Sequence, residues 1–257
     1  MTLAIEIDTL VPTVEDRRQS SLHVMLARRA DDVEAAQRLR YRVFVEEMGA
    51  RADSARPGIE SDRFDPFCRH LIVRDRACNR VVGCYRILTD EGARDAGGFY
   101  SQTEFDITRI LALPGRLMEV GRTCVHPDYR NGTTLALLWR GLTRFMFARG
   151  FDSLIGCASI PLAGGTDHAL AVYETLAKHH TSPEGCRVYP KMRLPRASGA
   201  PPANADAPPL LRAYLRAGAR ICGEPAWDPF FGVADLFLLL RLQDIRGRYA
   251  RHFLAHA

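Results

Sequence analysis

The sequence has no run of about 18 consecutive apolar residues, roughly the shortest length with which an α-helix crosses a bilayer. Residues 1–20 lack the basic-then-apolar pattern of a secretory signal and instead carry several acidic side chains. No segment recurs at a fixed period, which argues against a repeat protein. These absences predict a chain without a membrane-spanning helix that stays in the cytoplasm.

Seven cysteines are present, but no two of them form a Cys-x-x-Cys pair, and their number is odd. A disulfide framework normally uses an even number of cysteines, and a zinc site needs closely spaced ligands. The histidines show no ligand spacing with a third residue either. We therefore expect free thiols in a reducing compartment and no metal site.

Neither sign of charge dominates, because 35 Lys and Arg residues stand against 30 Asp and Glu residues, a net charge of +5. This mild basic bias favours an acidic partner or an anionic membrane surface. Basic runs interleaved with aromatic residues are missing, so we do not expect nucleic-acid binding. The end of the chain gathers Arg241, Arg246, Arg248 and Arg251, and we expect this basic end to contact the inner membrane peripherally.

At 257 residues, 47% of them hydrophobic, the chain is long enough to bury one substantial core. Prolines are unevenly placed, since residues 195–209 hold five of the 15. We therefore divide the chain into an N-terminal arm (1–20), a core (21–194), a linker or loop (195–209) and a C-terminal extension (210–257). The extension should complete the sheet of the core.

Hydrophobic periodicity predicts alternating strands and helices. Strands are expected at 22–28, 71–75, 81–90, 117–125, 153–160 and 233–242, and helices at 31–48, 133–150, 167–179 and 210–217. Asp31 or Asp32 can cap the first helix, and residues 77–79 can form a hairpin turn. A helix after each central strand implies crossovers between neighbouring strands. The order predicts an α/β fold with a mixed central sheet flanked by helices.

The central segment, residues 117–130, carries unusual polar residues. Alternation places Glu119 on one face of the expected strand and Arg122 on the opposite face. A buried strand rarely carries ionisable side chains without a partner or a function. Asp235, inside an apolar segment, needs a partner for the same reason. We therefore take Glu119 and Arg122 as candidate catalytic residues, with a structural ion pair as the alternative.

A polar turn that contains glycine follows this strand and leads into the helix expected from residue 133. The turn includes Arg130, Asn131 and Gly132, and Thr133 or Thr134 can cap the helix. Unpaired backbone N–H groups and the positive end of the helix dipole favour an anion at such a position. We therefore predict that Arg130, Asn131, Gly132 and Thr133 bind a phosphate, with a solvated Arg130 as the alternative.

This strand, turn and helix resemble the acyl-donor site of the GNAT superfamily of N-acyltransferases. In that superfamily the loop reads Arg/Gln-x-x-Gly-x-Gly/Ala, whereas here Arg130 and Gly132 have a different spacing and the second glycine is missing. The departure favours a donor with one phosphate, the phosphopantetheine arm of an acyl carrier protein, over coenzyme A. No other cofactor is implied. The backbone N–H groups of Thr123, Cys124 and Val125 are candidates for binding the donor carbonyl as its oxyanion forms.

Polar residues upstream resemble those of the autoinducer (acyl-homoserine lactone) synthases. The shared patterns are Arg-x-x-x-Phe, Asp-x-x-Asp, Gly-x-x-Arg and Glu-x-x-Arg, found here as Arg40 with Phe44, Asp62 with Asp65, Arg86, and Glu119 with Arg122. One departure is the absence of the tryptophan that those synthases carry a few residues after the Phe.

These upstream side chains suit an amino-acid substrate. A pair of loop carboxylates, Asp62 and Asp65, suits an ammonium group, and Arg40 and Arg86 can bind a carboxylate through paired hydrogen bonds. We therefore expect these four residues and Phe44 to bind the substrate. Solvated loop charges and interface salt bridges are the alternatives.

A longer resemblance covers nearly the whole chain. The fragments RYRVF, FDPFCRHLIV, FYSQTEFDI, GRTCVHPDYR and LLWRGL resemble the bacterial ornithine-lipid N-acyltransferases. Members of that family move an acyl chain, typically 3-hydroxylated, from acyl carrier protein to the α-amino group of ornithine. The resemblance implies an acyltransferase that makes the lyso form of an ornithine lipid. Glu119 would accept the proton of the amine, and Arg122 would orient a carboxylate or the donor carbonyl.

Three other functions stay open at this point. The enzyme could acylate an amino acid other than ornithine. An autoinducer synthase would act on S-adenosylmethionine and close a lactone, and a GNAT-like scaffold would catalyse nothing. An acyl-cysteine route through Cys124 is conceivable, although a buried thiol is the simpler interpretation of that residue.

Overall fold

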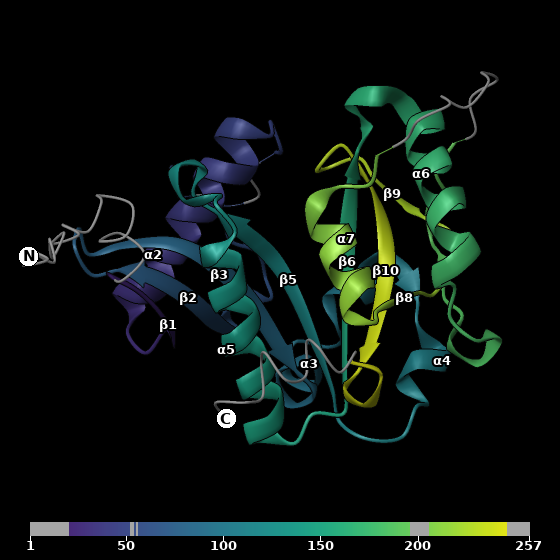
Figure 1. Cartoon of the computed structure of the whole chain (residues 1–257), viewed down its shortest axis with the longest axis horizontal. Helices are drawn as coiled ribbons and strands as arrows, with labels where there is room; N and C mark the ends of the chain where they lie inside the picture. Colours follow the sequence, from purple (N-terminus) through teal and green to yellow (C-terminus); the bar gives the residue numbers. More distant parts are fainter. Residues whose placement is uncertain (1–20, 52–53, 55, 196–205, 246–257) are drawn as a thin grey trace, which may run out of the picture.

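The computed structural model describes residues 21–51, 54, 56–195 and 206–245. The predicted arm (1–20), most of the predicted linker (196–205) and the basic end with Arg246, Arg248 and Arg251 lie outside the described residues. An eight-stranded sheet has the order β1-β2-β3-β5-β6-β10-β8, and β9 pairs with β10 (Figure 1). The predicted α/β class with a mixed sheet is therefore confirmed.

The strands of this sheet pair antiparallel except β5 and β6, which are parallel. The predicted hairpin is present, with Asn79 in its turn at φ 53. A separate pair is formed by β4 (Phe105–Asp106) and β7 (Tyr189–Pro190). The main sheet contains β1 (Leu22–Leu26), β2 (Arg69–Asp75), β3 (Arg80–Thr89), β5 (Leu117–Val125), β6 (Ser153–Pro161), β8 (Arg220–Ile221), β9 (Ala226–Asp228) and β10 (Val233–Arg241).

All four predicted helices are present, with shifted boundaries. No helix in the described part of the chain is long and apolar enough to cross a membrane. The α-helices are α2 (Ala30–Arg40), α3 (Asp90–Asp95), α4 (Thr108–Leu111), α5 (Thr133–Arg149), α6 (Gly165–His180) and α7 (Pro209–Ala217).

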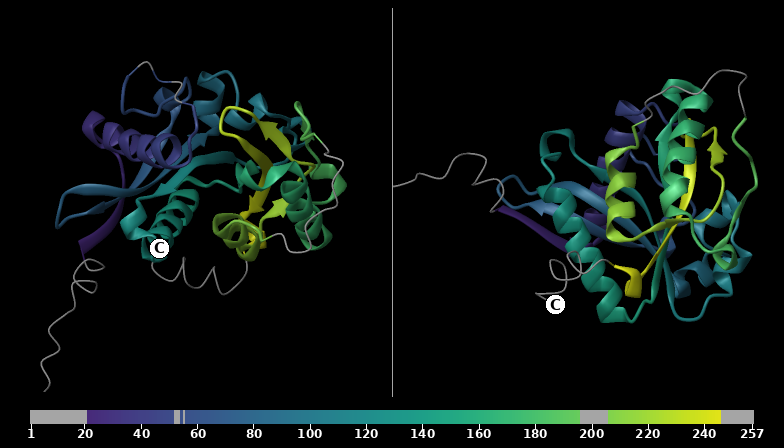
Figure 2. Two further views of the ribbon diagram at one scale, coloured as in Figure 1. Left: turned by 90° about the horizontal axis from the view of Figure 1, so that it is seen from above. Right: turned by 45° about the vertical axis from the view of Figure 1, so that its right-hand side comes forward.

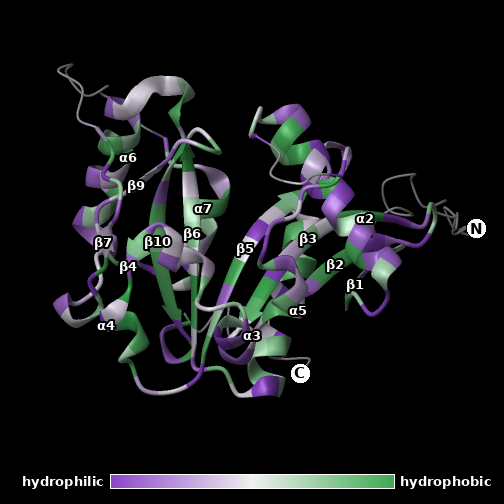
Figure 3. Cartoon of the chain, turned by 180° about the vertical axis from the view of Figure 1, so that it is seen from behind, coloured by the Kyte–Doolittle hydropathy of each residue, from purple (hydrophilic) through white to green (hydrophobic). Residues whose placement is uncertain are grey.

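Helices cover both faces of the sheet. α5 packs on β1, β2 and β3, and α2 lies across the sheet from it, against β3 and β5 (Figure 2). Apolar side chains of α5, such as Leu138 and Leu142, are fully buried against the strands and belong to the largest cluster of the core. Most of the sheet is coloured as hydrophobic in Figure 3, but β5 has hydrophilic residues along its length. The central strand β5 therefore carries candidate polar residues of the site.

The start of α2 differs from the prediction. Neither Asp31 nor Asp32 is the capping residue, because Arg29 precedes the first turn. The Asp32 carboxylate instead accepts hydrogen bonds from the backbone N–H groups of Arg28 and Arg29, each at 3.3 Å, from the third helical position. At its other end α2 continues into a π-helical turn, Tyr41–Glu47, a wider coil that often occurs at functional sites.

A bulge in β5 changes which side chains share a face. Two residues of β5, Arg122 and Thr123, lie opposite a single residue of β3, Tyr85. Arg122 has φ 51, a left-handed conformation that costs energy in a residue with a side chain. The extra residue brings Arg122 to the face of Glu119, and both contact Tyr100. The predicted placement of Glu119 and Arg122 on opposite faces was therefore wrong.

β5 and β6 separate soon after they meet. Residues 117–119 of β5 pair with residues 153–155 of β6, and no pairing follows. β6 instead remains paired with β10 as far as Pro161. Figure 1 shows the resulting divergence between the half of the sheet that ends in β5 and the half that begins with β6.

We predict that Gly156→Ala destabilises the protein at this divergence. A methyl group at Gly156 would collide with the backbone carbonyl oxygen of Val120 on β5. Forcing the strands apart should lower the free energy of unfolding in urea by about 1–3 kcal/mol. Gly185→Ala is the matched control, because a methyl group there meets no atom within 4 Å. Equal unfolding free energies for the two variants would contradict this account of the strand contact.

Candidate active site

A cavity of about 770 Å³ lies where β5 and β6 diverge. Its walls come from both strands, from the first turns of α5 and α7, and from the π-helical turn after α2. Many of its lining residues are apolar, among them Phe44, Leu88, Leu135, Leu154, Leu210 and Leu238. Such a lining suits a hydrocarbon chain.

The edge of β5 beside this cavity presents backbone N–H groups that have no strand partner. The His126 N–H donates to Val82 of β3 over 2.8 Å. Because an antiparallel ladder alternates, the amide of Cys124 also faces β3, whereas those of Thr123 and Val125 face away. β6 no longer pairs at this level. Two of the three predicted donor-binding amides are therefore directed toward the cavity.

α5 begins at the rim of the cavity in a way that corrects the predicted cap. Gly132, not Thr133 or Thr134, precedes the first turn, and its φ of 90 is a conformation that glycine adopts without strain. The side-chain oxygen of Asn131 accepts a hydrogen bond from the Thr133 N–H at 3.1 Å. Gly132 and Leu135 line the cavity, so the N-terminus of α5 faces it.

Arg130 also lines the cavity and is paired with Glu47. Its guanidinium donates to both oxygens of Glu47, at 2.6 and 2.7 Å, and to the Val125 carbonyl at 3.1 Å. Hydrogen bonding to Arg130 lowers the pKa of Glu47. Both side chains remain open to solvent, so a phosphate would have to compete with this carboxylate. Phosphate binding by Arg130 stays a prediction.

A second cavity, of about 400 Å³, adjoins the first. The two cavities share four lining residues, Tyr100, Arg122, Asp228 and Phe231. The smaller cavity is far more polar in its residues, with carboxylates, cations and aromatic rings around it. These include Asp62, Arg63, Phe64, Glu104, Lys191 and Trp227.

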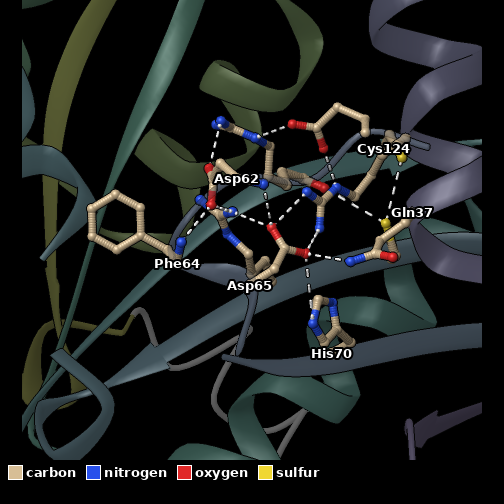
Figure 4. Close-up of polar contacts among 11 residues, drawn as sticks. Gln37, Asp62, Phe64, Asp65, His70 and Cys124 are labelled. Atoms are coloured by element: carbon tan, nitrogen blue, oxygen red, sulfur yellow. Dashed lines mark hydrogen bonds and ion pairs between the residues drawn. The ribbon is translucent and has the colours of Figure 1, made fainter. Parts of the chain in front are cut away.

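Beside the smaller cavity, three arginines and three carboxylates form a closed ionic network (Figure 4). Arg40 donates two hydrogen bonds to Asp65, at 2.7 and 3.0 Å, and a third to Glu60. Arg86 donates to Asp65 at 2.9 Å. The members of the network are Arg40, Glu60, Asp62, Asp65, Arg86 and Arg122.

Asp62 closes the network between two arginines. It accepts a hydrogen bond from Arg86 at 2.6 Å and another from Arg122 at 3.0 Å, while Arg122 also donates to Glu60 at 3.0 Å. Three positive charges therefore meet three negative charges. Sequence reasoning missed Glu60. The only indication of a further carboxylate was that the sequence offered three candidate arginines but only two candidate aspartates to pair with them.

The network holds the loop of residues 60–65 against the sheet. Arg40 is 0% exposed and Asp65 is 7% exposed, and neither lines a cavity. Although burial opposes ionisation, Arg40 holds the pKa of Asp65 well below its usual range. The position of Arg40 and Asp65 thus does not support direct substrate contact. Arg86, Asp62 and Phe44 each line a cavity, and their predicted role stays a prediction.

Arg122 lies where the two cavities meet. Its guanidinium carbon is 4.8 Å from the ring centroid of Tyr100 and 4.7 Å from that of Phe231, so the group is held between two aromatic faces. Burial opposes its charge, but Tyr100 and the carboxylates raise the pKa of Arg122 well above the usual value. Arg122 is therefore a fixed cation at the junction.

Glu119 binds the backbone of the neighbouring turn. Its carboxylate oxygens accept hydrogen bonds from the N–H groups of Tyr100, at 2.6 Å, and Ser101, at 2.8 Å. Burial raises the pKa of Glu119, and these hydrogen bonds act in the opposite direction. The carboxylate thus fixes residues 100–103, a 3₁₀ turn that carries Tyr100 to the junction.

A second group of carboxylates, which we call the acidic cluster, consists of Glu104, Asp228 and Asp235. One oxygen of each lies within 4.8 Å of the others, a spacing that could hold a cation. Sequence reasoning did not select Glu104 or Asp228. It did single out Asp235 as needing a partner, and the Ser159 hydroxyl donates to it at 2.6 Å.

Cys124 is buried beside a second thiol. Its sulfur lies 3.5 Å from that of Cys84, and burial raises the pKa of Cys124 well above the usual value. A thiol without a thiolate form is a poor nucleophile. The structure therefore favours the buried-thiol interpretation over an acyl-cysteine route.

Known proteins resemble this chain at two levels. A family model described as an acetyltransferase (GNAT) domain matches residues 39–140. An L-ornithine N(alpha)-acyltransferase of Brucella abortus is 38% identical over 263 residues, which cover 93% of this chain and 91% of that protein. A protein of the same name from Rhizobium meliloti is 37% identical over 259 residues, which cover 93% and 86%.

Solved structures share the fold at much lower identity. The CoA-dependent acyl-homoserine lactone synthase BjaI, with MTA, has a TM-score of 0.54 at 18% identity, covering 92% of this chain and 88% of that one. FeeM, an N-acyl amino acid synthase from uncultured soil microbes, has a TM-score of 0.53 at 11% identity, covering 87% and 93%. These likenesses establish the fold alone. Because relatives that are 37% and 38% identical each cover 93% of it, the chain belongs to the L-ornithine N(alpha)-acyltransferase family.

Proposed function

We propose that this protein transfers an acyl chain from a thioester donor to the α-amino group of L-ornithine, the first step toward an ornithine lipid. The observation that carries the proposal is the meeting of a largely apolar cavity and a polar one at Tyr100, Arg122, Asp228 and Phe231. An acyl chain suits the first cavity and an amino acid suits the second, so the reacting atoms would meet at the junction. The activity named for the relatives supports ornithine as the acceptor.

In this proposal the larger cavity binds the acyl donor. The thioester carbonyl would lie against β5, where the N–H groups of Thr123 and Val125 can stabilise the oxyanion as it forms. The phosphate of a phosphopantetheine arm would reach the N-terminus of α5 beside Gly132 and Arg130. The missing second glycine supports a donor carried by acyl carrier protein, which is an acidic partner for a basic chain.

The reaction is an aminolysis. The neutral amine nitrogen attacks the thioester carbon, the carbon–sulfur bond breaks, and the proton lost by the amine is taken up by the leaving thiolate. The protein contributes position and charge stabilisation, and no covalent intermediate is needed. The product is an amphiphile, so peripheral contact with an anionic membrane through the basic end is part of the proposal.

The proposal is tested by supplying acyl carrier protein thioesters, with and without a 3-hydroxyl group, together with single amino acids. We expect Nα-acyl-ornithine with a free δ-amine, identified by mass spectrometry after amine labelling. The rate should fall as salt rises from about 0.05 to 0.5 M, because screening weakens the attraction of an acidic carrier. The matching coenzyme A thioester should be used poorly.

Each alternative gives a different result. An acyl-homoserine lactone formed from S-adenosylmethionine would make the protein an autoinducer synthase. No product from any acceptor would favour a scaffold. Equal use of both donors with a flat salt profile would refute the carrier protein while leaving ornithine acylation in place.

Glu119 is better placed to position Tyr100 than to accept a proton, because both of its oxygens already accept backbone hydrogen bonds. Replacement by Gln would turn an amide NH₂ toward one of these N–H donors. A buried donor left unpaired costs about 1–3 kcal/mol. Glu119 therefore acts, in this proposal, through residues 100–103 and the junction that they form.

We predict that Glu119→Gln lowers the free energy of unfolding in urea by about 1–3 kcal/mol and raises the KM for ornithine more than it lowers kcat. Glu119→Asp should restore part of both. The opposite result for Glu119→Gln would identify Glu119 as the base. In that case the variant would keep wild-type stability and KM, its kcat would be lost, and the acid limb of its pH–rate profile would disappear.

A further inference from the structure

We propose that the acidic cluster of Glu104, Asp228 and Asp235 binds the side-chain ammonium group of the acceptor and makes the protein specific for an amino acid with a second amine. The inference rests on the proposed function and adds a subsite to it.

No ion pair within the described residues balances the charges of the cluster, although Arg122 faces Asp235 from beyond salt-bridge distance. No arginine, lysine or histidine of the described residues forms a salt bridge with any of the three carboxylates. The network around Glu60 and Asp62, by contrast, matches every carboxylate with arginine. Buried carboxylates without a cation are costly, so the cluster is complete only when it binds a positive charge or protons.

The hydrogen bonds of the cluster leave one carboxylate unused. Asp235 accepts from Ser159, and Asp228 accepts from the N–H groups of Phe230 and Phe231 at 2.8 and 3.1 Å. Both oxygens of Glu104 are shielded from solvent and accept no hydrogen bond of ordinary geometry from the described residues, while burial and the neighbouring carboxylates of Asp235 and Asp228 raise the pKa of Glu104 well above its usual value. An ammonium group carries three N–H donors, and it can supply what these oxygens lack.

The backbone holds this unused carboxylate in place. The Glu104 N–H donates to the Ser101 carbonyl at 3.1 Å, and the Glu104 carbonyl accepts from the Lys191 N–H at 2.7 Å. Asp235 is opposite Ser159 in the β10–β6 pair, and Asp228 is opposite Val233 in the β9–β10 pair. The three acids therefore come from separate elements that fold toward one point.

The cluster lies at the boundary between the two cavities. Glu104 and Asp228 line the smaller cavity, and Asp228 and Asp235 line the larger one. Tyr100 and Trp227 line the smaller cavity as well, and aromatic faces favour a nearby cation. The ornithine side chain has only three methylene groups, so an ammonium held here keeps the α-amine near the junction.

This arrangement explains which amine reacts. Carboxylates around an ammonium group favour its protonated form, and a protonated amine is not a nucleophile. The δ-nitrogen of ornithine would thus be protected by binding, while the α-nitrogen is free to lose its proton. The exposed cations Arg63 and Lys191 at the same cavity are available to the substrate carboxylate.

The pH dependence of stability gives an independent check. Burial raises the pKa of Asp235 to about 6, above its ordinary value of 3.8, and the charged groups that face it are Glu104, Asp228 and Arg122. The stability that comes from protonating Asp235 is therefore present below about pH 4 and is lost as the pH rises through about 6. We predict that the urea midpoint of the wild type falls more between about pH 4.5 and about pH 8 than the midpoint of Asp235→Asn does, because this interval spans the raised pKa of Asp235. Equal falls would show that the cluster is not strained by its own charge.

The decisive experiment compares ornithine with norvaline, which has the same carbon skeleton without the δ-amine. Wild-type protein should bind ornithine at least about 100-fold more tightly by calorimetry, with or without donor present. Glu104→Gln, which keeps the size of the side chain, should weaken ornithine binding by roughly 30-fold and leave norvaline unchanged. The same ratios should appear in kcat/KM for acylation. Glu174→Gln on α6, an exposed residue outside both cavities, is the matched control.

Loss of folding does not explain the expected result. Burial and the carboxylates of Asp235 and Asp228 raise the pKa of Glu104 well above its usual value, so Glu104→Gln replaces a carboxyl that is costly to ionise and should keep or raise the thermal midpoint. An unchanged preference for ornithine in Glu104→Gln would overturn the subsite while leaving ornithine acylation intact. Ornithine binding that is lost with EDTA and restored by Mg²⁺ or Mn²⁺ would overturn it too, by making the cluster a metal site. Tight ornithine binding without any acylation would support the subsite and refute the proposed function.

Discussion

Both cavities meet at one extra residue in the central strand, because Arg122 lines each of them. The last β5–β6 pair is Glu119 with Ile155, and the bulge at Arg122 follows shortly afterwards, where the sheet opens. The bulge turns Arg122 onto the face of Glu119. The same local irregularity therefore lies beside the larger cavity, the proposed donor site, and places a cation between that cavity and the polar one.

The protein treats its buried carboxylates in two different ways. The loop carboxylates Glu60, Asp62 and Asp65 form salt bridges with three arginines, so their charge is neutralised within the fold. The acidic cluster has hydrogen bonds from Ser159 and two backbone amides, but no residue in the described part of the chain forms a salt bridge with it. A carboxylate that the fold has neutralised says little about the ligand, whereas one that the fold has left unmatched indicates what the ligand must bring.

Much of the fold could be predicted from the sequence, because hydrophobic periodicity records which face of each element is buried. Six of the strands, the long helices and the hairpin around Asn79 follow from that pattern, whereas the two- and three-residue strands β4, β7, β8 and β9 are too short to show it. The bulge does not, since nothing in the letters around Arg122 separates a regular strand from one with an extra residue. The error in its side-chain direction was therefore unavoidable from periodicity alone.

The site was predictable in its motifs but not in its roles. Arg40 and Asp65 were selected from a motif and Glu119 from its place in a buried strand, and each has its partners inside the protein. Pairing is decided by distance in space, and Glu60 is 20 positions from Arg40 in the chain. Glu104 and Asp228 lie in short segments without a strong period, so only the structure brings them to Asp235.

The closed network of arginines and carboxylates has an entropic consequence. Six side chains, several of them long and flexible, lose their rotamer freedom when the chain folds and not when a substrate arrives. Residues 60–65 thus form a wall of the smaller cavity that is already in place. An amino acid bound there, as proposed, would give up its own freedom of motion but would not have to order that wall, which leaves more of the contact energy for affinity and for selection.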